Sequence, residues 1–294
     1  SINSFFKNED DAQSAMNGVY VQMRNVGGGL YLYGDERADN TEQTDLGTGN
    51  AATRNTIQPT TGGPDWGGYY SFLKDVNFVL AKVPEITFTN QEKKNDLLAQ
   101  AHFVRAWTYF MIVRIWGDAP LITEPFESPD QEGLIPGQRD PASALFTQIK
   151  ADIETSLGLY SNNAIDSRYK ATQAATNMLK TDVYLWTAKR EGGGTADLNT
   201  ALAAVNQVIG LPELELLADY AGVFRTTSAT NEDIFTLYRD LVEGGGFFAG
   251  RYNLSDSFWA SLSAEDQARI PFIRGSVRFY TATQTLRDQI IANA

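Results

Sequence analysis

The sequence predicts an all-α protein built from helical hairpins. Apolar residues recur at helical spacing in six segments, which is typical of helices with one buried face. The last two of these segments are separated only by residues 191–194 (EGGG), as in an antiparallel helical hairpin of tetratricopeptide size. Of the 294 residues, 43% are hydrophobic and 12% aromatic, which is enough for a sizeable core. The length fits one large domain or two ordinary ones.

The first two helices are expected on either side of a long loop. Asn8 and the acidic residues after it are typical of a helix start, so a helix is predicted over about residues 8–26, ending at the glycines 27–29. Residues 27–68 are rich in Gly, Thr, Asn and Asp and predict a long irregular loop. The second helix is expected over residues 69–83, before Pro84.

The third helix, over residues 91–116, is the element that the sequence predicts most strongly. Twelve of the sixteen residues from 101 to 116 are apolar, which predicts a helix packed on most sides at the centre of the protein. The fourth helix is expected over residues 140–159, with Asp140 as its cap and Pro141 in its first turn. The third and fourth helices are expected to pair across a longer connection.

The hairpin predicted over residues 169–210 consists of helices at 169–189 and 195–209, with alanines where the helices cross closely. Beyond it, residues 234–238 (IFTLY) alternate as in a short strand or an extended segment. Residues 240–280 are rich in Gly and aromatic residues and predict a second loop region. A final helix is predicted over residues 281–291.

Composition excludes several classes of function. The chain carries 24 Lys and Arg against 36 Asp and Glu, a net charge of −12 that would repel nucleic acid, and no segregated basic patch is visible. It has no cysteine, which excludes disulfides, thiolate metal sites and a cysteine nucleophile. We expect no cofactor and no metal.

The single histidine, His102, lies in the most apolar helix, and no nucleophile motif accompanies it, so we expect a structural role. Arg105 and Arg114 could hold an anion among aromatic residues. A buried arginine more often pairs with a carboxylate, because an unpaired buried charge is very unfavourable. Asp75 and Asp182, on neighbouring predicted helices, are the candidate partners.

Acidic residues give weaker signals. The loop carboxylates Asp35, Glu36, Asp39 and Asp45 could bind calcium, but they lack the regular spacing of a calcium loop, so a solvated loop is favoured. A pair of carboxylates for glycoside hydrolysis cannot be singled out among 36 acidic residues.

Aromatic residues in the two loop regions are the best candidates for a binding site. Flat rings that stack on sugars, beside side chains that form hydrogen bonds, make a platform for a neutral glycan. The candidate ligand-binding residues are Trp66, Trp259, Tyr252, Phe248, Asp65 and Asn55. For Tyr69 and Tyr70, at a helix start, a packing role over the helical core is favoured instead.

Five segments, in the right order, resemble the RagB/SusD family of surface glycan-binding lipoproteins of Bacteroidetes. They are AMNGVY at 15–20, Trp66 and Tyr70 followed by VNFVL at 76–80, AHFVRAWTYF at 101–110 continued by VRIWGDAPLI at 113–122, ATNMLKTDVYLW at 175–186, and NEDIF at 231–235. The strongest of these is the third.

The resemblance implies one SusD-like domain over residues 1–294, with a tetratricopeptide-like superhelical scaffold and ligand-binding loops, in a lipoprotein of the outer membrane. It implies capture of oligosaccharides, or of peptides in some members, and delivery to a SusC-like TonB-dependent transporter without catalysis. The family's lipid-bearing N-terminal cysteine does not occur in this sequence. A later helix of the family, with a pattern like R-x-A-E-x-L-L, does not occur in it either, so part of the C-terminal binding surface is expected to be missing.

Two other functions stay open. One is an all-α glycoside hydrolase or lyase that uses two carboxylates, which turnover of a polysaccharide would reveal. The other is a tetratricopeptide-type adaptor that binds a peptide or protein in a helical groove, which a protein partner without sugar affinity would reveal.

Overall fold

The computed structural model describes residues 5–34, 66–126, 138–219 and 228–238, with short pieces at 37–38, 41–43, 56, 58, 223, 263–265 and 280–282. The chain forms two compact units. The first unit comprises Ser1–Arg24 and Trp66–Tyr238, and the second comprises Asn25–Asp65 and Arg239–Ala294. The assignment of residues 1–294 to one domain stays a prediction.

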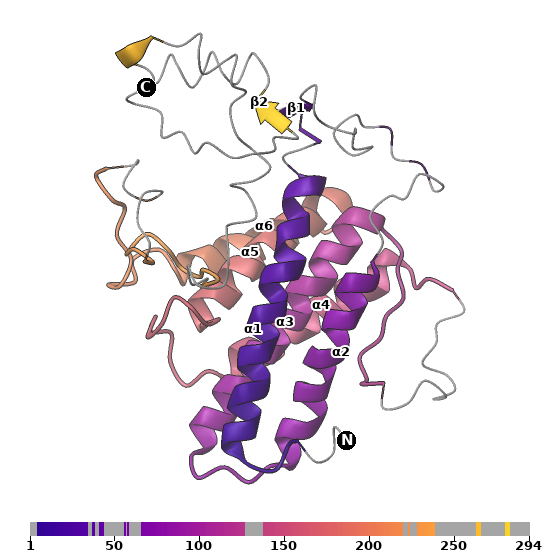
Figure 1. The fold of residues 1–294 in the computed structure, drawn as a ribbon, viewed down its shortest axis with the longest axis vertical. Coiled ribbons are helices and arrows are strands. Elements are labelled where there is room, and N and C mark those ends of the chain that lie inside the picture. Colours follow the sequence, from indigo (N-terminus) through magenta and orange to yellow (C-terminus); the bar gives the residue numbers. More distant parts are fainter. Residues whose placement is uncertain are drawn as a thin grey trace. The chain divides into compact units, whose positions relative to one another are not determined.

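The first unit is all-α, as predicted (Figure 1). Its described part contains six α-helices, the first of which continues beyond Arg24. They are α1 (Glu9–Tyr33), α2 (Gly67–Lys82), α3 (Gln91–Trp116), α4 (Ala142–Leu159), α5 (Gln173–Arg190) and α6 (Gly194–Asn206), with a short 3-10 helix, η2 (Val83–Glu85), after α2.

The helices pack as the predicted hairpins. α3 lies against α4 and α5 lies against α6, while α2 covers α3 and α4 contacts α5. Ala174, Ala175, Ala201 and Ala204 are buried, and such small side chains let α5 and α6 approach closely. α3 is buried on most of its circumference, which explains why its sequence is apolar nearly all round.

Side-chain caps set the starts of α3 and α5. The Asn90 side chain accepts hydrogen bonds from the backbone N–H groups of Glu92 and Lys93, at 2.8 and 3.4 Å. Thr172 caps α5 by accepting from the Ala175 N–H at 3.4 Å. The predicted start of this helix at Tyr169 is therefore wrong by four residues, because an N-cap residue has non-helical backbone and the helix begins after it.

The predicted end of the first helix is also wrong. α1 continues through Gly27, Gly28 and Gly29 to Tyr33, so the long loop begins later than expected. Glycine keeps its backbone N–H and weakens a helix by only about 1 kcal/mol relative to alanine, whereas proline breaks it. Leu30 and Leu32, which are good helix formers, follow the glycines.

The predicted cap of the fourth helix has another role. α4 begins at Ala142, and the Ala142 N–H donates to Asp118 Oδ1 at 2.8 Å. Asp140, the expected cap, accepts from the Leu121 N–H at 2.8 Å, and its backbone pairs with Ala119 in an antiparallel bridge. The segment after α3 is thereby attached to the entry of α4, a long-range contact that local sequence rules do not contain.

The late part of the chain differs from the prediction in one element. In the second unit, β1 (Thr41–Gln43) pairs antiparallel with β2 (Tyr280–Ala282), with Thr41 opposite Ala282. The final helix therefore does not begin at residue 281, because Thr and Tyr favour strands and here find a partner strand. Residues 283–291 of that prediction lie outside the described residues.

Residues 234–238, predicted as a strand or an extended segment, belong to no strand ladder in the described part of the chain. Thr236 instead donates one backbone hydrogen bond to the Arg168 carbonyl at 2.8 Å. The Phe235 ring packs against Tyr20 of α1 and Phe103 of α3, so this segment covers the helices with an aromatic side chain.

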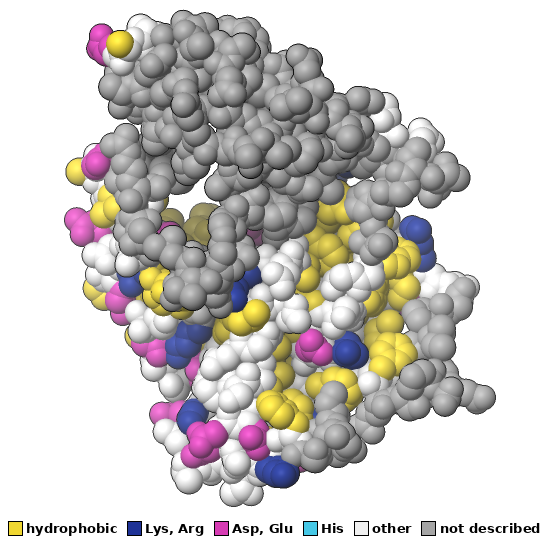
Figure 2. Space-filling model, in the orientation of Figure 1, with side chains coloured by type: hydrophobic (Ala, Val, Ile, Leu, Met, Phe, Trp, Pro, Cys, Tyr) yellow, Lys and Arg dark blue, Asp and Glu magenta, His cyan; other side chains and the backbone are white. Residues whose placement is uncertain are grey.

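Charged side chains are dispersed over the described surface. On the face drawn in Figure 2, acidic and basic side chains lie among polar and apolar ones without a continuous basic patch on the described residues.

Candidate ligand-binding surface

An aromatic cluster joins the start of α2 to the end of α3. We define it as Trp66, Tyr69, Tyr70 and Trp116. The Trp66 ring lies 5.9 Å from that of Tyr70 and 6.1 Å from that of Trp116, and Tyr69 lies 5.4 Å from Trp116. All three contacts are edge-to-face, the geometry that the ring quadrupoles favour. The cluster is therefore a packed unit in which each ring fixes its neighbours.

Arg139 completes the surface beside this cluster. Its guanidinium carbon lies over the Trp66 ring, 4.7 Å from the centroid, and its Nη1 donates to the Asp118 carbonyl at 3.4 Å. The cation covers part of the indole, and Trp66 stays half-buried. The site thus combines a partly exposed indole with a guanidinium donor, two groups that can contact a sugar.

The tyrosines of the cluster support the site as neutral groups. Burial raises the pKa of Tyr69 to about 12 and raises the pKa of Tyr70 further, so neither ionises near neutral pH. The Tyr70 hydroxyl donates to the Pro120 carbonyl at 2.5 Å. The packing role expected for Tyr70 is thereby supported, because its polar tip is used to hold the segment after α3.

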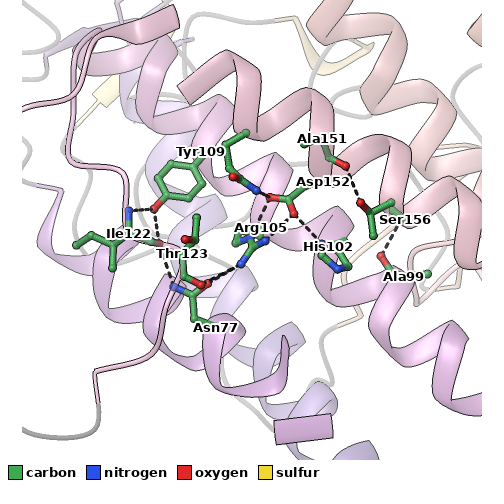
Figure 3. A network of polar contacts seen from close by, with 12 residues as sticks. Asn77, Ala99, His102, Arg105, Tyr109, Ile122, Thr123, Ala151, Asp152 and Ser156 are labelled. Carbon is green, nitrogen blue, oxygen red and sulfur yellow. Dashed lines mark hydrogen bonds and ion pairs between the residues drawn. The ribbon is translucent and has the colours of Figure 1, made fainter. Parts of the chain in front are cut away.

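A buried polar network lies below this segment (Figure 3). The Arg105 guanidinium binds Asp152 of α4 with two hydrogen bonds, from Nε to Oδ2 at 2.9 Å and from Nη2 to Oδ1 at 2.7 Å. Its third nitrogen donates to Asn77 Oδ1 and to the Thr123 carbonyl, both at 3.2 Å. One arginine therefore connects α2, α3, α4 and the segment after α3.

Two further side chains hold the same segment. Asn77 donates to the Ile122 carbonyl at 3.0 Å. The Tyr109 hydroxyl donates to that carbonyl at 2.6 Å and accepts from the Ile122 N–H at 2.7 Å. Since Pro120 in this segment accepts from Tyr70, the network and the aromatic cluster share a support. The network therefore holds the segment after α3 from one side and Tyr70 of the aromatic cluster holds it at Pro120.

The prediction of a buried arginine paired with a carboxylate is confirmed for Arg105, but its predicted partners are wrong. Arg105 is 8% exposed and Asp152 is 1% exposed. Asp75 is 43% exposed and lies beside Lys74 instead. Asp152 stands between Ile149 and Ile153, both fully buried, so its position on the core face of α4 gave it access to Arg105.

Arg114 differs from Arg105 because it is exposed. Its positive charge acts on Asp182, where burial raises the carboxyl pKa and Arg114 opposes that rise. The two residues form no ion pair within 4 Å in the described structure. The predicted pairing with Asp182 is therefore a longer-range interaction and not a buried ion pair.

His102 has the structural role that its surroundings predict. Its Nδ1 lies 2.7 Å from Asp152 Oδ1, the oxygen that also accepts from Arg105. Gln148 donates to the other carboxylate oxygen at 3.1 Å. Asp152 is 1% exposed and is bonded by three side chains, so this carboxylate holds the packed helices together.

The network predicts a loss of stability in acid. Burial alone would raise the Asp152 pKa, but hydrogen bonds from His102 and Arg105 outweigh it and lower that pKa below its ordinary value. A carboxyl group with a lowered pKa in the folded state contributes stability above its unfolded pKa of about 3.9 and loses it as the pH falls through the folded value. We expect the free energy of unfolding to fall over this acid range.

Urea unfolding at a series of pH values from neutral to strongly acid measures this effect. In an Asp152→Asn variant the contribution of this carboxyl to the pH dependence should be absent, although the variant is less stable throughout. An Asp118→Asn variant, which keeps Asp152, should retain the acid slope. Equal slopes in the wild type and the Asp152→Asn variant would contradict the assignment.

Of the predicted ligand-binding residues, the structure describes one. Trp66 lies in the aromatic cluster, whereas Trp259, Tyr252, Phe248, Asp65 and Asn55 lie outside the described residues. The acidic residues Asp35, Glu36, Asp39 and Asp45, considered for calcium, lie outside them too. Within the residues that the structure describes, no group of three or more His, Cys, Asp or Glu could hold a metal ion.

The sequence prediction did not include two members of the surface, Trp116 and Arg139. Trp116 is the last residue of α3, and Arg139 precedes α4 by three residues. No sequence spacing relates either residue to Trp66. The bridge between Ala119 and Asp140, which brings the two chain segments together, is a tertiary feature.

Comparison with known families agrees with this architecture. A family model for SusD-like proteins, described as "Starch-binding associating with outer membrane", matches residues 7–185. SusD-like protein P25 of Formosa agariphila is 25% identical over 245 residues, which cover 79% of this chain and 45% of that protein. The chain spans about half the length of the curated relatives it matches, or less.

Solved structures show the same fold. NanU of B. fragilis has a TM-score of 0.74 at 30% identity, over 85% of this chain and 52% of that one. A SusD superfamily protein from Bacteroides fragilis has a TM-score of 0.80 over 96% of this chain and 61% of that one, at 23% identity. Because the family model matches more than half of this chain, the chain belongs to the SusD-like family.

Proposed function

We propose that this chain is the helical scaffold of a non-catalytic protein that binds oligosaccharides or polysaccharide fragments at the bacterial cell surface. The observation that carries the proposal is the match of residues 7–185 to a family described as starch-binding and associated with the outer membrane. That range contains the aromatic cluster and Arg139, which supply an indole and a guanidinium at one surface.

The chemistry of this surface supports binding rather than catalysis. A half-buried indole offers an apolar contact to sugar C–H groups, and Arg139 offers N–H donors to sugar hydroxyls. The neighbouring tyrosines stay neutral because burial raises the pKa of each. The His102–Asp152 pair is fixed by Arg105 in the core, so these groups act as support.

Delivery to a SusC-like TonB-dependent transporter is part of the proposal and rests on the family resemblance. The same holds for attachment to the outer membrane by an N-terminal lipid. In the described part of the chain, no helix is both long and apolar enough to cross a membrane. Attachment through a lipid is a mode of membrane association that needs no such helix.

We expect Trp66→Ala to weaken binding of a polysaccharide about tenfold or more, because buried aromatic side chains at the centre of a binding surface contribute most of its affinity. The dissociation constant is measured by affinity gel electrophoresis at a series of polymer concentrations. Trp259→Ala is expected to act in the same direction. Trp186→Ala serves as the matched control, because it removes an indole that lies outside the aromatic cluster.

Circular dichroism of each variant must show the wild-type helix content, since Trp66 stands at the start of α2 and its removal leaves the hydrophobic interior in place. Unchanged affinity in both Trp66→Ala and Trp259→Ala would contradict the assignment of the site. Equal losses of affinity in these variants and in Trp186→Ala would show that removing an indole weakens binding by disturbing the fold and not by removing a contact to the ligand.

A further inference from the structure

A second surface of the first unit has a different chemistry. A cavity of about 380 Å³ opens between the C-terminal parts of α3 and α5. Its lining residues are Phe110 and Arg114 of α3 and Asp182, Leu185, Trp186, Lys189 and Arg190 of α5. Three cations thus face one carboxylate, in a chain whose net charge is −12. Such a local excess of positive charge runs against the charge of the whole molecule.

The two arginines of this cavity are held by aromatic rings. The Arg114 guanidinium lies 5.1 Å from the centroid of the Phe110 ring and 5.3 Å from that of Trp186. The Arg190 guanidinium lies 5.9 Å from the centroid of Trp186. Stacking of this kind restrains the side chain while its N–H groups, at the edge of the plane, keep their capacity to bind a carboxylate in a bidentate manner.

The positive charges of the cavity are not neutralised by close ion pairs in the described structure. Arg114, Lys189 and Arg190 form no ion pair among the described residues, whereas Arg105, Lys150, Lys170 and Lys180 all do. All three stand in the last turn of their helices, where the helix dipole favours cations. The dipole explains why cations are tolerated there, but it leaves their N–H groups available.

The remaining lining residues indicate what kind of anion fits. Leu185 is 47% exposed beside the cations and offers an apolar contact. Asp182, on the same helix, can accept N–H donors from a ligand. The guanidinium groups already cover part of the Trp186 ring, which reduces the area on which a sugar could stack.

We propose that this cavity binds an acidic peptide segment of a partner protein. The side chain of an Asp or Glu contacts Arg114 and Arg190, a neighbouring apolar side chain lies on Leu185, and a backbone N–H of the peptide donates to Asp182. This site is separate from the aromatic cluster and goes beyond the proposed glycan binding, so either function can fail without the other.

Two synthetic peptide pools test the proposal. The first contains tetrapeptides with one Asp or Glu and one Leu, Ile, Val or Phe, acetylated and amidated so that the side chain is the sole charge. The second replaces Asp by Asn and Glu by Gln. Equilibrium dialysis of each pool against the purified chain, with mass spectrometry of the retained peptides, measures binding. We expect retention from the acidic pool and not from its amide counterpart, and weaker retention at high salt.

Charge-removing variants locate the binding. Arg114→Gln and Arg190→Gln should each reduce retention of the acidic peptides about tenfold, as expected for the loss of a charge-assisted hydrogen bond. Both residues are exposed, so the melting temperature should stay at the wild-type value. Lys93→Gln, at the other end of α3, removes the same charge elsewhere and should leave retention unchanged.

Three results would overturn the proposal. The first is the absence of retention from the acidic pool, and the second is equal retention from both pools. The third is an equal effect of Lys93→Gln and Arg114→Gln, which would show attraction by net charge alone.

Glucuronic acid is dialysed in parallel. If it is retained in an Arg114-dependent manner while no peptide is retained, the cavity is assigned to an acidic sugar instead. Normal affinity for a neutral polysaccharide in Arg114→Gln would show that glycan binding is independent of this cavity.

Discussion

Replacing Arg105 by alanine is expected to lower the free energy of unfolding by about 3–5 kcal/mol, the cost of leaving one partner of a buried ion pair without the other. Asp152 is 1% exposed, so it would lose two charge-assisted hydrogen bonds in a buried environment. The variant also removes donors to Asn77 and to the Thr123 carbonyl, which loosens the segment below the aromatic cluster.

Urea unfolding followed by circular dichroism measures this loss. Arg114→Ala is the matched control, because it removes an exposed arginine from the same helix and should change stability far less. In the double variant Arg105→Ala/Asp152→Ala, the loss should be smaller than the sum of the two single losses, because no uncompensated charge stays buried. A wild-type melting temperature for Arg105→Ala would contradict the buried-pair account.

The Arg105→Ala variant should change ligand affinity less than it changes stability. Arg105 is 8% exposed and its nitrogens bind Asp152, Asn77 and Thr123, so it does not reach a ligand directly. Measured at a temperature where the variant is folded, polysaccharide affinity should stay within severalfold of the wild type. Complete loss of binding by a fully folded variant would mean that the network contacts the ligand.

Replacing Ile149 by alanine is expected to destabilise the protein by about 2–5 kcal/mol, the range for truncating a large buried aliphatic side chain. Ile149 is fully buried on α4, the helix that packs against α3. Removal of its side chain leaves a cavity that the packed helices can fill only in part.

Thr147→Ala is a control two residues away on the same helix. Thr147 is exposed, and its hydroxyl donates to the Ser143 carbonyl within the helix, so its replacement should have little effect. Denaturant unfolding of both variants compares the two faces of α4. Equal stabilities for Ile149→Ala and Thr147→Ala would contradict the packing of α4 on α3.

Helical periodicity was sufficient to predict most of the scaffold. Both predicted ends of α3 agree with the structure, in which Asn90 caps the start and Gly117 follows the end with φ 70°, a conformation that favours glycine. The hairpin of α5 and α6 was predicted because only a glycine-rich turn separates two amphipathic segments. These signals are local, and local signals can be identified from one sequence.

The errors concern interactions between residues far apart in the chain. Asp140 was predicted as a cap from its position before Pro141, but tertiary contacts direct it to Leu121 and bring Asp118 to α4. The acidic partner of Arg105 was predicted on the wrong helices. The helical periodicity of α4 places Asp152 on the face toward the core, but it does not show which cation Asp152 contacts. The end of α1 was misplaced because glycine weakens a helix without ending it.

The candidate site was predicted in part. The aromatic character of Trp66 and its place before a helix indicated a binding residue, and the structure adds Trp116 and Arg139 beside it. Their proximity depends on the bridge between Ala119 and Asp140, which has no sequence signature. The ligand-binding roles of Trp66, Trp259, Tyr252, Phe248, Asp65 and Asn55 stay predictions.

The most direct test of non-catalytic glycan binding is affinity electrophoresis of the purified chain in a panel of neutral and acidic polysaccharides, with the polymer length measured afterwards. The account predicts retardation by one or a few polysaccharides and a polymer of unchanged length after prolonged contact. Shortened polymer would contradict it in favour of a hydrolase or lyase. An unchanged mobility in every gel would contradict glycan binding by this chain.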